Sequence, residues 1–409
     1  MQCGLLGKHL SHSFSPRIHS QLGDYPYKLY EVQPENLENF LKTEPFTGIN
    51  VTIPYKKEVI AFCDELSPTA ALLGAVNTIV RRDGKLIGHN TDYQGFLSML
   101  QKTGLCVSGK KVLVLGSGGA SATVTAVLKE LDTNVVVVSR SGENNYTNLH
   151  KHKDAAVIVN TTPVGMYPNN GDSPLDLDAF PALEGVLDLI YNPSRTALLL
   201  QAEERGLISE NGLFMLVAQA KESAEWFMGK SIKNDIISTI YENLRNKTQN
   251  IILIGMPGCG KSTVGKLLAE RLQRKFVDAD TEIENVDNAT IPEIFHNKGE
   301  SAFRMIETQV LSELGKQSGL VIATGGGCVT VPENYNILHQ NGYIICLERD
   351  INRLPTTGRP LSSSNNLQTM YTQRKPLYRR FQDISIDNNC DAEATVSTIL
   401  SHLCKGGTL

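Results

Sequence analysis

The chain has 409 residues, of which 41% are hydrophobic and 20% are charged, and its formal net charge is -4. This length predicts two or three compact units, because a single hydrophobic core stops growing well below it. The slightly acidic balance and the scattered basic residues exclude a polyanion-binding surface, so we expect no nucleic-acid partner.

We expect a cytoplasmic protein without a membrane partner, because the sequence shows neither a targeting signal nor a disulfide pattern. The first residues lack the basic start and apolar run of a signal peptide, and no apolar run approaches the length of a membrane span. The eight cysteines form no C-x-x-C pair and stand beside no histidine ligand pattern. We therefore expect reduced structural thiols rather than a metal site or a disulfide framework.

Four short polar segments stand out in the first 98 residues: SHSFSP, NVTIPYK, GAVNT and GHNTD. Their hydroxyl, amide and carboxyl groups suit hydrogen bonds to a polyhydroxylated ligand, and Lys56 can supply a proton. Taken singly, each serine, threonine or asparagine is better explained by a turn or a helix cap. The side chains selected as candidate ligand contacts are Ser13, Ser15, Thr52, Asn77, Asn90 and Asp92.

From Lys110 the sequence reads as an apolar strand, a glycine-rich turn, a helix and a second apolar strand. This order predicts a βαβ unit on a buried parallel sheet. In LGSGGASATV, small residues between strand and helix let backbone amides approach a pyrophosphate. The second strand ends VVSRSG, with Arg140 where a 2′-phosphate would lie and no acidic residue for a ribose hydroxyl, which favours NADP over NAD.

Two further apolar segments, AAVIVNTT and GVLDLIY, extend this predicted sheet. From Leu213 to about Arg245 the apolar residues are spaced for one buried face of a helix. The polar stretch RNKTQN then ends the helical region before a second strand, turn and helix begin.

Taken in order, these segments, together with DLIYNP and GLFMLVAQA, resemble those of shikimate dehydrogenases over essentially all of residues 1–245. The resemblance implies an α/β substrate-binding domain at 1–98, completed by helices returning at 213–245, and an NADP-binding Rossmann-like domain at 99–212. It implies that Ser13 and Ser15 bind the substrate carboxylate. The further substrate contacts that it implies are Thr52, Asn77, Asp92, Tyr191 and Gln219.

The same resemblance implies the reduction of 3-dehydroshikimate to shikimate, in which NADPH gives a hydride to the ring ketone. Negative charge then builds on the ketone oxygen. Lys56, as an ammonium, can stabilise that oxygen and give it a proton, while Asp92 orients the lysine. A salt bridge of purely structural use is the alternative for this pair.

The NADP site implied by the resemblance lies in the glycine turn, after the second strand and near the end of the Rossmann-like domain. Its residues are Gly116, Ser117, Gly118, Gly119, Ala120, Ser139, Arg140, Ser141, Ile190 and Gly212. The family often has a second arginine where this chain has Asn144, and losing that contact would weaken the preference for NADP. A dehydrogenase that uses NAD or acts on quinate stays open as an alternative.

The segment GMPGCGKS, which follows the apolar run IILI, satisfies the P-loop pattern G-x-x-x-x-G-K-[ST]. Its backbone amides are expected to cradle the β-phosphate of ATP, with Lys261 reaching the β- and γ-phosphates and Ser262 binding Mg²⁺. The residues expected to contact the nucleotide here are Gly258, Cys259, Gly260, Lys261, Ser262 and Thr263.

The segments after the P-loop indicate which kind of substrate could accept the phosphoryl group. FVDAD places Asp278 and Asp280 at a strand end, where one carboxylate can support Mg²⁺ and the other a substrate hydroxyl. The segments GESAFRMIE, VIATGGG, RDINRLPTTGRPL and QRKPLYRR follow. Their arginines suit the charge of a γ-phosphate or the fork of a carboxylate, although a lone arginine is better explained as solvated.

Together these segments resemble shikimate kinases over residues 249–409. The resemblance implies a P-loop kinase domain in which a small parallel sheet is wrapped by helices and a lid excludes water from ATP. It implies that Asp280 orients the 3-hydroxyl of shikimate and that Asp278 lies near Mg²⁺. The other implied residues are Arg304, Gly326 and Arg374 for the substrate, and Arg359 with Arg353 for the lid.

The two halves predict a bifunctional α/β enzyme of chorismate and aromatic amino acid biosynthesis: NADPH-dependent reduction of 3-dehydroshikimate, then ATP-dependent phosphorylation of shikimate. An alternative is that the P-loop half only senses ATP for the dehydrogenase. The acceptor-side residues argue against a mere sensor, since a sensor has no need of them. The sequence leaves the oligomeric state open.

Overall fold

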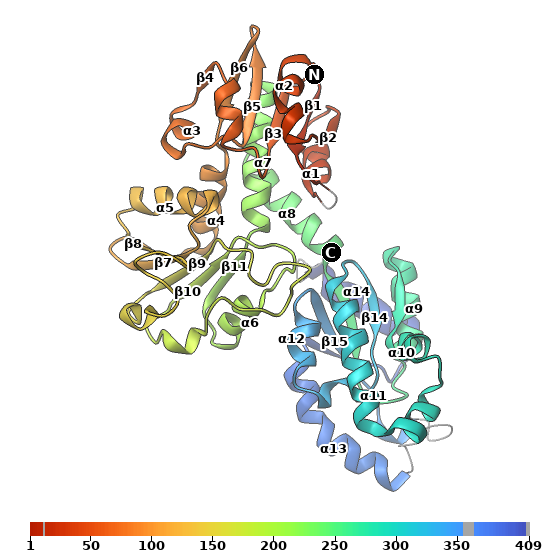
Figure 1. Cartoon of the computed structure of the whole chain (residues 1–409). Helices are drawn as coiled ribbons and strands as arrows, with labels where there is room; N and C mark the ends of the chain where they lie inside the picture. The colour runs from red at the N-terminus through yellow and green to blue at the C-terminus, as the bar shows by residue number, and fades with distance from the viewer. Residues whose placement is uncertain (11–12, 355–363, 406–409) are drawn as a thin grey trace. The chain divides into compact units, whose positions relative to one another are not determined.

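The computed structural model describes residues 1–10, 13–354 and 364–405, and the chain separates into two compact units (Figure 1). The first unit consists of Met1–Val164, Ser173–Tyr191 and Gln201–Tyr241, and the second of Gly165–Asp172, Asn192–Leu200 and Glu242–Leu409. Helices pack on strands in both units, so the α/β fold class predicted from the sequence is confirmed.

A mixed sheet of six strands, in the order β2-β1-β3-β5-β6-β4, forms the N-terminal part of the first unit. β1 is parallel to β2 and β3, whereas β5 is antiparallel to β3 and β6. Its strands are β1 (Cys3–Gly7), β2 (Tyr27–Glu31), β3 (Gly48–Val51), β4 (Glu65–Leu66), β5 (Thr78–Arg82) and β6 (Lys85–His89). Its helices are α1 (Ser15–Leu22), α2 (Leu37–Thr43) and α3 (Pro68–Leu73), with the 3-10 turns η1 (Pro34–Asn36) and η2 (Glu58–Phe62).

A parallel sheet of five strands, in the order β11-β10-β9-β7-β8, follows. Its three inner strands are mostly apolar and buried, as a sheet covered on both faces requires. The strands are β7 (Lys111–Leu115), β8 (Asn134–Val138), β9 (Val157–Asn160), β10 (Gly185–Asp188) and β11 (Ile208–Asn211). The helices are α4 (Asp92–Thr103), α5 (Gly119–Glu130) and α6 (Ala197–Glu204), with η3 (Leu149–His152) and η4 (Leu177–Ala179).

The helical region expected from Leu213 onward is two helices, α7 (Leu213–Met228) and α8 (Asp235–Thr248). Gly229 ends α7 with a φ of +66°, a left-handed conformation that glycine adopts without steric cost. α8 continues past the expected end, so part of the polar stretch RNKTQN is helical. α7 packs against α1, α4 and the six-stranded sheet, which places it beside the substrate pocket described below.

A second parallel sheet of five strands, in the order β13-β14-β12-β15-β16, is the centre of the second unit. β12 is buried throughout and lies in the middle of the order. The strands are β12 (Asn250–Ile254), β13 (Phe276–Asp278), β14 (Val321–Ala323), β15 (Gly342–Glu348) and β16 (Ile384–Asp387). The helices are α9 (Lys261–Leu272), α10 (Ala279–Asp287), α11 (Ile291–Lys316), α12 (Asn334–His339), α13 (Ser364–Phe381) and α14 (Ala392–Lys405), with η5 (Cys328–Thr330) and η6 (Ile351–Arg353).

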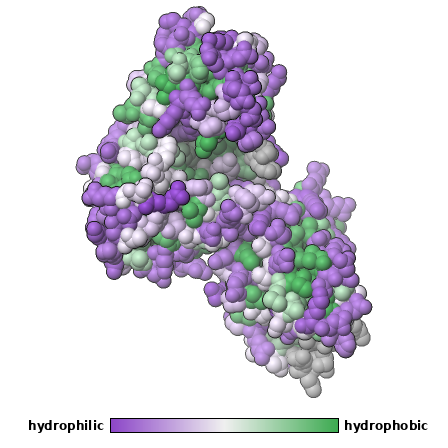
Figure 2. Space-filling model, in the orientation of Figure 1, coloured by the Kyte–Doolittle hydropathy of each residue, from purple (hydrophilic) through white to green (hydrophobic). Residues whose placement is uncertain are grey.

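The visible face of each unit is mostly hydrophilic, with small scattered hydrophobic patches (Figure 2). Within the described residues, no helix combines the length and apolar character needed to cross a membrane.

Helices α4 and α7 cross at Gly95, where there is no room for a side chain. A methyl group on Gly95 would lie 2.9 Å from both Gln219 Cβ and the backbone oxygen of Met215. A backbone atom cannot move aside as a flexible side chain can, so this glycine sets the separation of the two helices.

We predict that Gly95→Ala lowers the stability of the first unit by about 1–3 kcal/mol, because the added methyl forces α4 and α7 apart. The single tryptophan, Trp226, lies on α7, so its fluorescence during thermal unfolding reports on this unit alone. Gln94→Ala, at the exposed neighbouring position, is the control and should unfold like the wild type. Equal melting temperatures for all three proteins would contradict the close packing.

Candidate active sites

A cavity of about 340 Å³ lies in the first unit, and it is lined by Lys56 and by every substrate residue that the family resemblance implies. Those residues are Ser13, Ser15, Thr52, Lys56, Asn77, Asp92, Tyr191 and Gln219. They come from segments far apart in the sequence, which the six-stranded sheet, α4 and α7 bring together. Two of the expected cofactor residues, Ala120 and Gly212, also line this cavity, so it extends to the parallel sheet.

Lys56 and Asp92 form an ion pair at the edge of this cavity. Lys56 Nζ donates a hydrogen bond to Asp92 Oδ2 at 2.6 Å, and the two side chains are 30% and 18% exposed. Lys56 follows β3, where the fully buried Tyr55 holds the turn by donating to the backbone oxygen of Val32 at 2.5 Å. Asp92 is the first residue of α4. The ammonium is thus held in place and still reachable from the cavity.

Asn90, a candidate ligand contact on sequence grounds, serves the backbone instead. Its side-chain amide donates to the oxygen of Ala75 at 2.9 Å, and its carbonyl accepts from the Asp92 amide at 3.1 Å. Both interactions fix the start of α4. This is the turn role that such residues often play, and the cavity lining does not include Asn90.

A buried cluster of hydroxyl and amide groups lies behind the cavity, and no sequence pattern indicated it. Ser223 Oγ lies 2.8 Å from Thr78 Oγ1 and 3.0 Å from Thr91 Oγ1, and it accepts from Asn50 Nδ2 at 2.8 Å. Thr91 Oγ1 in turn contacts both Asn77 and Gln219, two of the expected substrate residues. The cluster therefore fixes their amides.

The expected cofactor turn is open at the N-terminus of α5. Gly116 has a φ of +108°, and side-chain atoms at Gly118 or Gly119 would meet nothing within 4 Å. Ser117 is exposed with them, which leaves the backbone amides of the turn accessible. This geometry fits a dinucleotide pyrophosphate, since exposed amides at a helix N-terminus favour an anion.

Of the other expected cofactor residues, some are exposed and one is buried. Arg140 and Ser141 are exposed after β8, while the amide of Ser139 donates to the oxygen of Asn144 at 3.0 Å. Ile190 is buried and outside the cavity lining. Thr161, which was not predicted from the sequence, lies beside the cofactor turn. Its Oγ1 would lie 2.7 Å from a methyl on Gly116. Its position directly after an apolar strand was a signal that it lies at the same end of the sheet as this turn.

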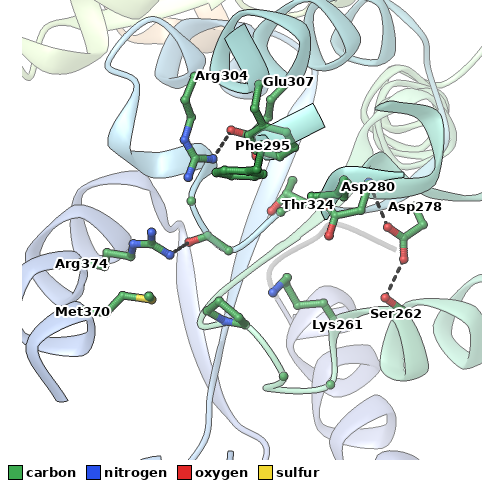
Figure 3. Close-up of a pocket in the computed structure, with 18 of the residues that line it drawn as sticks. Lys261, Ser262, Asp278, Asp280, Phe295, Arg304, Glu307, Thr324, Met370 and Arg374 are labelled. Atoms are coloured by element: carbon green, nitrogen blue, oxygen red, sulfur yellow. Dashed lines mark hydrogen bonds and ion pairs between the residues drawn. The ribbon is translucent and has the colours of Figure 1, made fainter. Parts of the chain in front are cut away.

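The second unit has a cavity of about 560 Å³ that joins the P-loop to the expected acceptor residues (Figure 3). The expected residues in its lining are Gly258, Gly260, Lys261, Ser262, Thr263, Asp278, Asp280, Arg304, Gly326 and Arg374. Cys259 is fully buried and outside the lining, so its side chain takes no part. Arg359 lies outside the described residues. Arg353 donates to the oxygen of Asn389 at 2.8 Å, just after β16.

Lys261 folds back over the P-loop. Its Nζ donates to the backbone oxygens of Gly255 and Met256 at 2.9 and 3.1 Å, and the residue is only 8% exposed. Gly255, Gly258 and Gly260 have φ values of +138°, +82° and +103°, which permit this tight loop. Polyphosphate oxygens can replace the two carbonyls as acceptors for the ammonium.

Ser262 and Asp278 form an oxygen pair beside Lys261 (Figure 3). Ser262 Oγ donates to Asp278 Oδ2 at 2.6 Å, and Asp278 Oδ1 accepts from the Asp280 amide at 3.1 Å. A hydroxyl and one carboxylate fit Mg²⁺, which completes its octahedral shell with water and phosphate oxygens rather than with a full set of protein ligands.

The acceptor side carries two carboxylates and two arginines. Arg304 NH1 donates to the fully buried Glu307 at 2.6 Å, and Arg374 NH1 donates to the oxygen of Gly326 at 3.1 Å. Burial raises the pKa of Asp280 and of Glu307, and the nearby Lys261 and Arg304 oppose that rise. The two arginines face the cavity from α11 and α13, so they can grip a carboxylate together.

Glu307 lies in the segment GESAFRMIE, and its role was not predicted from the sequence. The spacing R-x-x-E on a helix places the two side chains on one face, which was an available signal. Its second oxygen, Oε1, has no hydrogen-bond partner among the described residues. A methyl on Gly325 would lie 2.5 Å from this oxygen and 2.9 Å from Asp280 Oδ1, so both carboxylates crowd the glycine turn.

Known proteins resemble both units. A family model described as shikimate kinase matches residues 257–404, and one described as shikimate dehydrogenase substrate binding domain matches residues 5–79. A shikimate dehydrogenase (NADP(+)) of Clostridium perfringens is 36% identical over 264 residues, which is 59% of this chain and 97% of that protein.

Solved structures agree with the dehydrogenase match. Shikimate dehydrogenase 1 from Peptoclostridium difficile is 37% identical with a TM-score of 0.55, covering 60% of this chain and 97% of that chain. A chorismate mutase/shikimate 5-dehydrogenase fusion protein from Clostridium acetobutylicum is 38% identical with a TM-score of 0.58, at the same coverage. A shikimate 5-dehydrogenase from Thermus thermophilus in complex with NADP(H) and shikimate is 31% identical with a TM-score of 0.55, covering 59% and 99%.

Glu222 on α7 is a half-buried acid that interacts electrostatically with Asp92 of the first cavity. Its Oε2 has no hydrogen-bond partner among the described residues. Burial, reinforced by Glu225, raises the pKa of Glu222 from 4.5 to about 7; Asp92 acts in the same direction and Lys221 opposes it. A carboxyl group with a raised pKa stabilises the fold while it is protonated. That contribution is complete below pH 4.5 and is lost as the pH rises through about 7.

We predict that Glu222→Gln stabilises the first unit at pH 8 by up to about 3 kcal/mol and changes little at pH 5, since glutamine is never charged. Thermal unfolding followed by Trp226 fluorescence at both pH values measures the difference. Glu143→Gln, an exposed site, should show no such pH dependence. A Glu222→Gln effect of the same size at both pH values would mean that ionisation is not its cause.

Proposed function

This chain belongs to the shikimate dehydrogenase family and carries a C-terminal shikimate kinase domain, and from this premise we propose that it catalyses two successive reactions. The first is NADPH-dependent reduction of 3-dehydroshikimate to shikimate. The second is ATP-dependent phosphorylation of the 3-hydroxyl of shikimate. One observation carries the proposal: each unit has a cavity that brings the expected reacting groups and substrate contacts together.

In the reduction, Lys56 is proposed to act on the ketone oxygen. NADPH, bound at the Gly116 turn, supplies the hydride. The Lys56 ammonium, held by Asp92 at 2.6 Å, stabilises the charge on the oxygen and gives it a proton. Ser13 and Ser15, which line the same cavity, suit the substrate carboxylate as hydroxyl donors.

In the phosphorylation, Asp280 is proposed to orient the acceptor hydroxyl and accept its proton. Burial raises the pKa of Asp280, which makes its carboxylate a stronger base. Arg304 and Arg374 hold the substrate carboxylate, and Lys261 neutralises the phosphates. Ser262 and Asp278 would hold Mg²⁺, which supplies further charge neutralisation for the phosphates.

We predict that Lys56→Ala lowers the reduction rate at least about a hundredfold and leaves phosphorylation intact, because only the first cavity loses its acid. Lys261→Ala should do the reverse, since the P-loop loses its cation. Both assays are run on the same purified full-length protein, with product identification. Loss of both activities from one substitution in a folded protein would exclude independent sites. If the wild type reduced 3-dehydroshikimate but formed no shikimate 3-phosphate, the P-loop would be a regulatory ATP site.

We also predict that removing divalent cations with EDTA abolishes phosphorylation and leaves the reduction rate unchanged. Asp278→Asn should raise the Mg²⁺ concentration needed for half-maximal kinase activity, because one ligand oxygen loses its charge. Glu270→Gln, which removes one negative charge at an exposed position on α9, is the matched control and should keep the wild-type requirement. An unchanged requirement in Asp278→Asn would remove Asp278 from the metal site.

A further inference from the structure

Arg349 lines the P-loop cavity, and none of the expected roles includes it. It directly follows Glu348, the last residue of β15, at the carboxyl end of the sheet. β15 pairs with β12, the strand that leads into the P-loop, and a methyl on Gly255 would lie 2.6 Å from the oxygen of Leu347. The end of β15 and the start of the P-loop are therefore in direct contact.

The guanidinium of Arg349 reaches the turn where the P-loop becomes helix α9. Its NH1 would lie 3.8 Å from a methyl on Gly260, the residue that caps α9. Asn388, after β16, lies closer to the same glycine, because its Nδ2 would be 2.7 Å from the methyl on Gly260. The same Nδ2 donates to the backbone oxygen of Cys259 at 2.5 Å. Asn388 thus fixes the backbone of the turn, whereas Arg349 brings a positive charge to it.

Within the part of the chain that the structure describes, Arg349 has no anionic partner. Its Nε is buried without an acceptor, and no ion pair joins it to a carboxylate. The neighbouring Asp350 is occupied, because its Oδ1 accepts from both the amide and the side chain of Asn352. A half-buried cation without a partner is unfavourable, so this position favours an anion that enters the cavity.

The strand order of the sheet indicates which phosphate groups of a bound nucleotide would lie next to Arg349. Asp280 follows β13 and Gly326 follows β14, both on one side of β12, whereas Arg349 follows β15, on the other side. The transferred γ-phosphoryl must face the acceptor. The nucleoside end then extends toward β15 and β16, with the phosphates closest to the nucleoside between them.

We propose that Arg349 is a further nucleotide-binding residue that contacts the phosphates nearest the nucleoside. It would complement Lys261, which is expected to reach the β- and γ-phosphates. This inference rests on the proposed binding of ATP in this cavity. The contact is a charge-assisted hydrogen bond to a phosphate oxygen, for which arginine offers a planar fork of donors.

The test is calorimetric titration of the full-length protein with ADP and with ATP in the presence of Mg²⁺. Arg349→Gln should weaken both nucleotides by the same factor, about tenfold or more, because both carry the contacted phosphates. Arg349→Lys should recover part of the loss, since lysine keeps the charge without the fork. The matched control is Arg271→Gln, an exposed α9 arginine paired with Glu393, which should bind both nucleotides as the wild type does.

Steady-state kinetics on the same variants distinguish a loss of nucleotide binding from a general disruption of the folded protein. The KM for ATP should rise in Arg349→Gln, while the KM for shikimate and the dehydrogenase rate stay at wild-type values. Wild-type affinity for ADP in Arg349→Gln would overturn the proposal, and so would a weakening of ATP alone, which would place the contact at the γ-phosphate. A wild-type protein that bound neither nucleotide would instead contradict the proposed kinase function.

Discussion

The carboxyl ends of parallel strands are the constraint on which both sites depend. In a parallel sheet the chain leaves every strand at the same edge, so residues distant in sequence are collected there. The glycine turn at Gly116 follows β7, and Thr161 follows β9 beside it. In the second unit the P-loop follows β12, Asp278 ends β13 and Arg349 follows β15. The cofactor turn of the first unit and the cavity of the second therefore lie at strand ends, and the helices that start there supply backbone amides for anions.

The two units manage buried acids in different ways. In the first, Asp92 is paired with Lys56, while Glu222 lies behind them with one oxygen unpartnered among the described residues. In the second, Glu307 is fully buried and paired with Arg304. A carboxylate that holds a cation in place costs less to bury than a lone one, because Coulomb attraction offsets part of the desolvation. Each paired acid is therefore placed to orient a functional cation, whereas burial favours the protonated form of Glu222.

Sequence reasoning recovered the parts of the sites that lie in contiguous motifs and missed those made by tertiary contact. Lys56, Lys261 and their neighbours stand in short segments whose chemistry can be read directly, and the α/β class follows from the alternation of apolar strands and helices. Ser223 could not be found this way, because its partner Asn50 is 173 residues away and neither position is unusual. Arg349 lies in the arginine-bearing segment RDINRLPTTGRPL, but only strand pairing places it beside the P-loop.

The chemistry of the two proposed reactions gives a reason for their union in one chain. The ketone that receives the hydride becomes a hydroxyl, and the same oxygen then attacks the γ-phosphoryl group of ATP. Both sites must therefore recognise one ring and its carboxylate while exposing the same oxygen to different chemistry. The first cavity meets that oxygen with a cation, Lys56, because charge develops as the ketone is reduced. The second meets it with a carboxylate, Asp280, because the hydroxyl must lose its proton. The two proposed sites thus present opposite charges to the same oxygen atom, each matched to the step that it is proposed to catalyse.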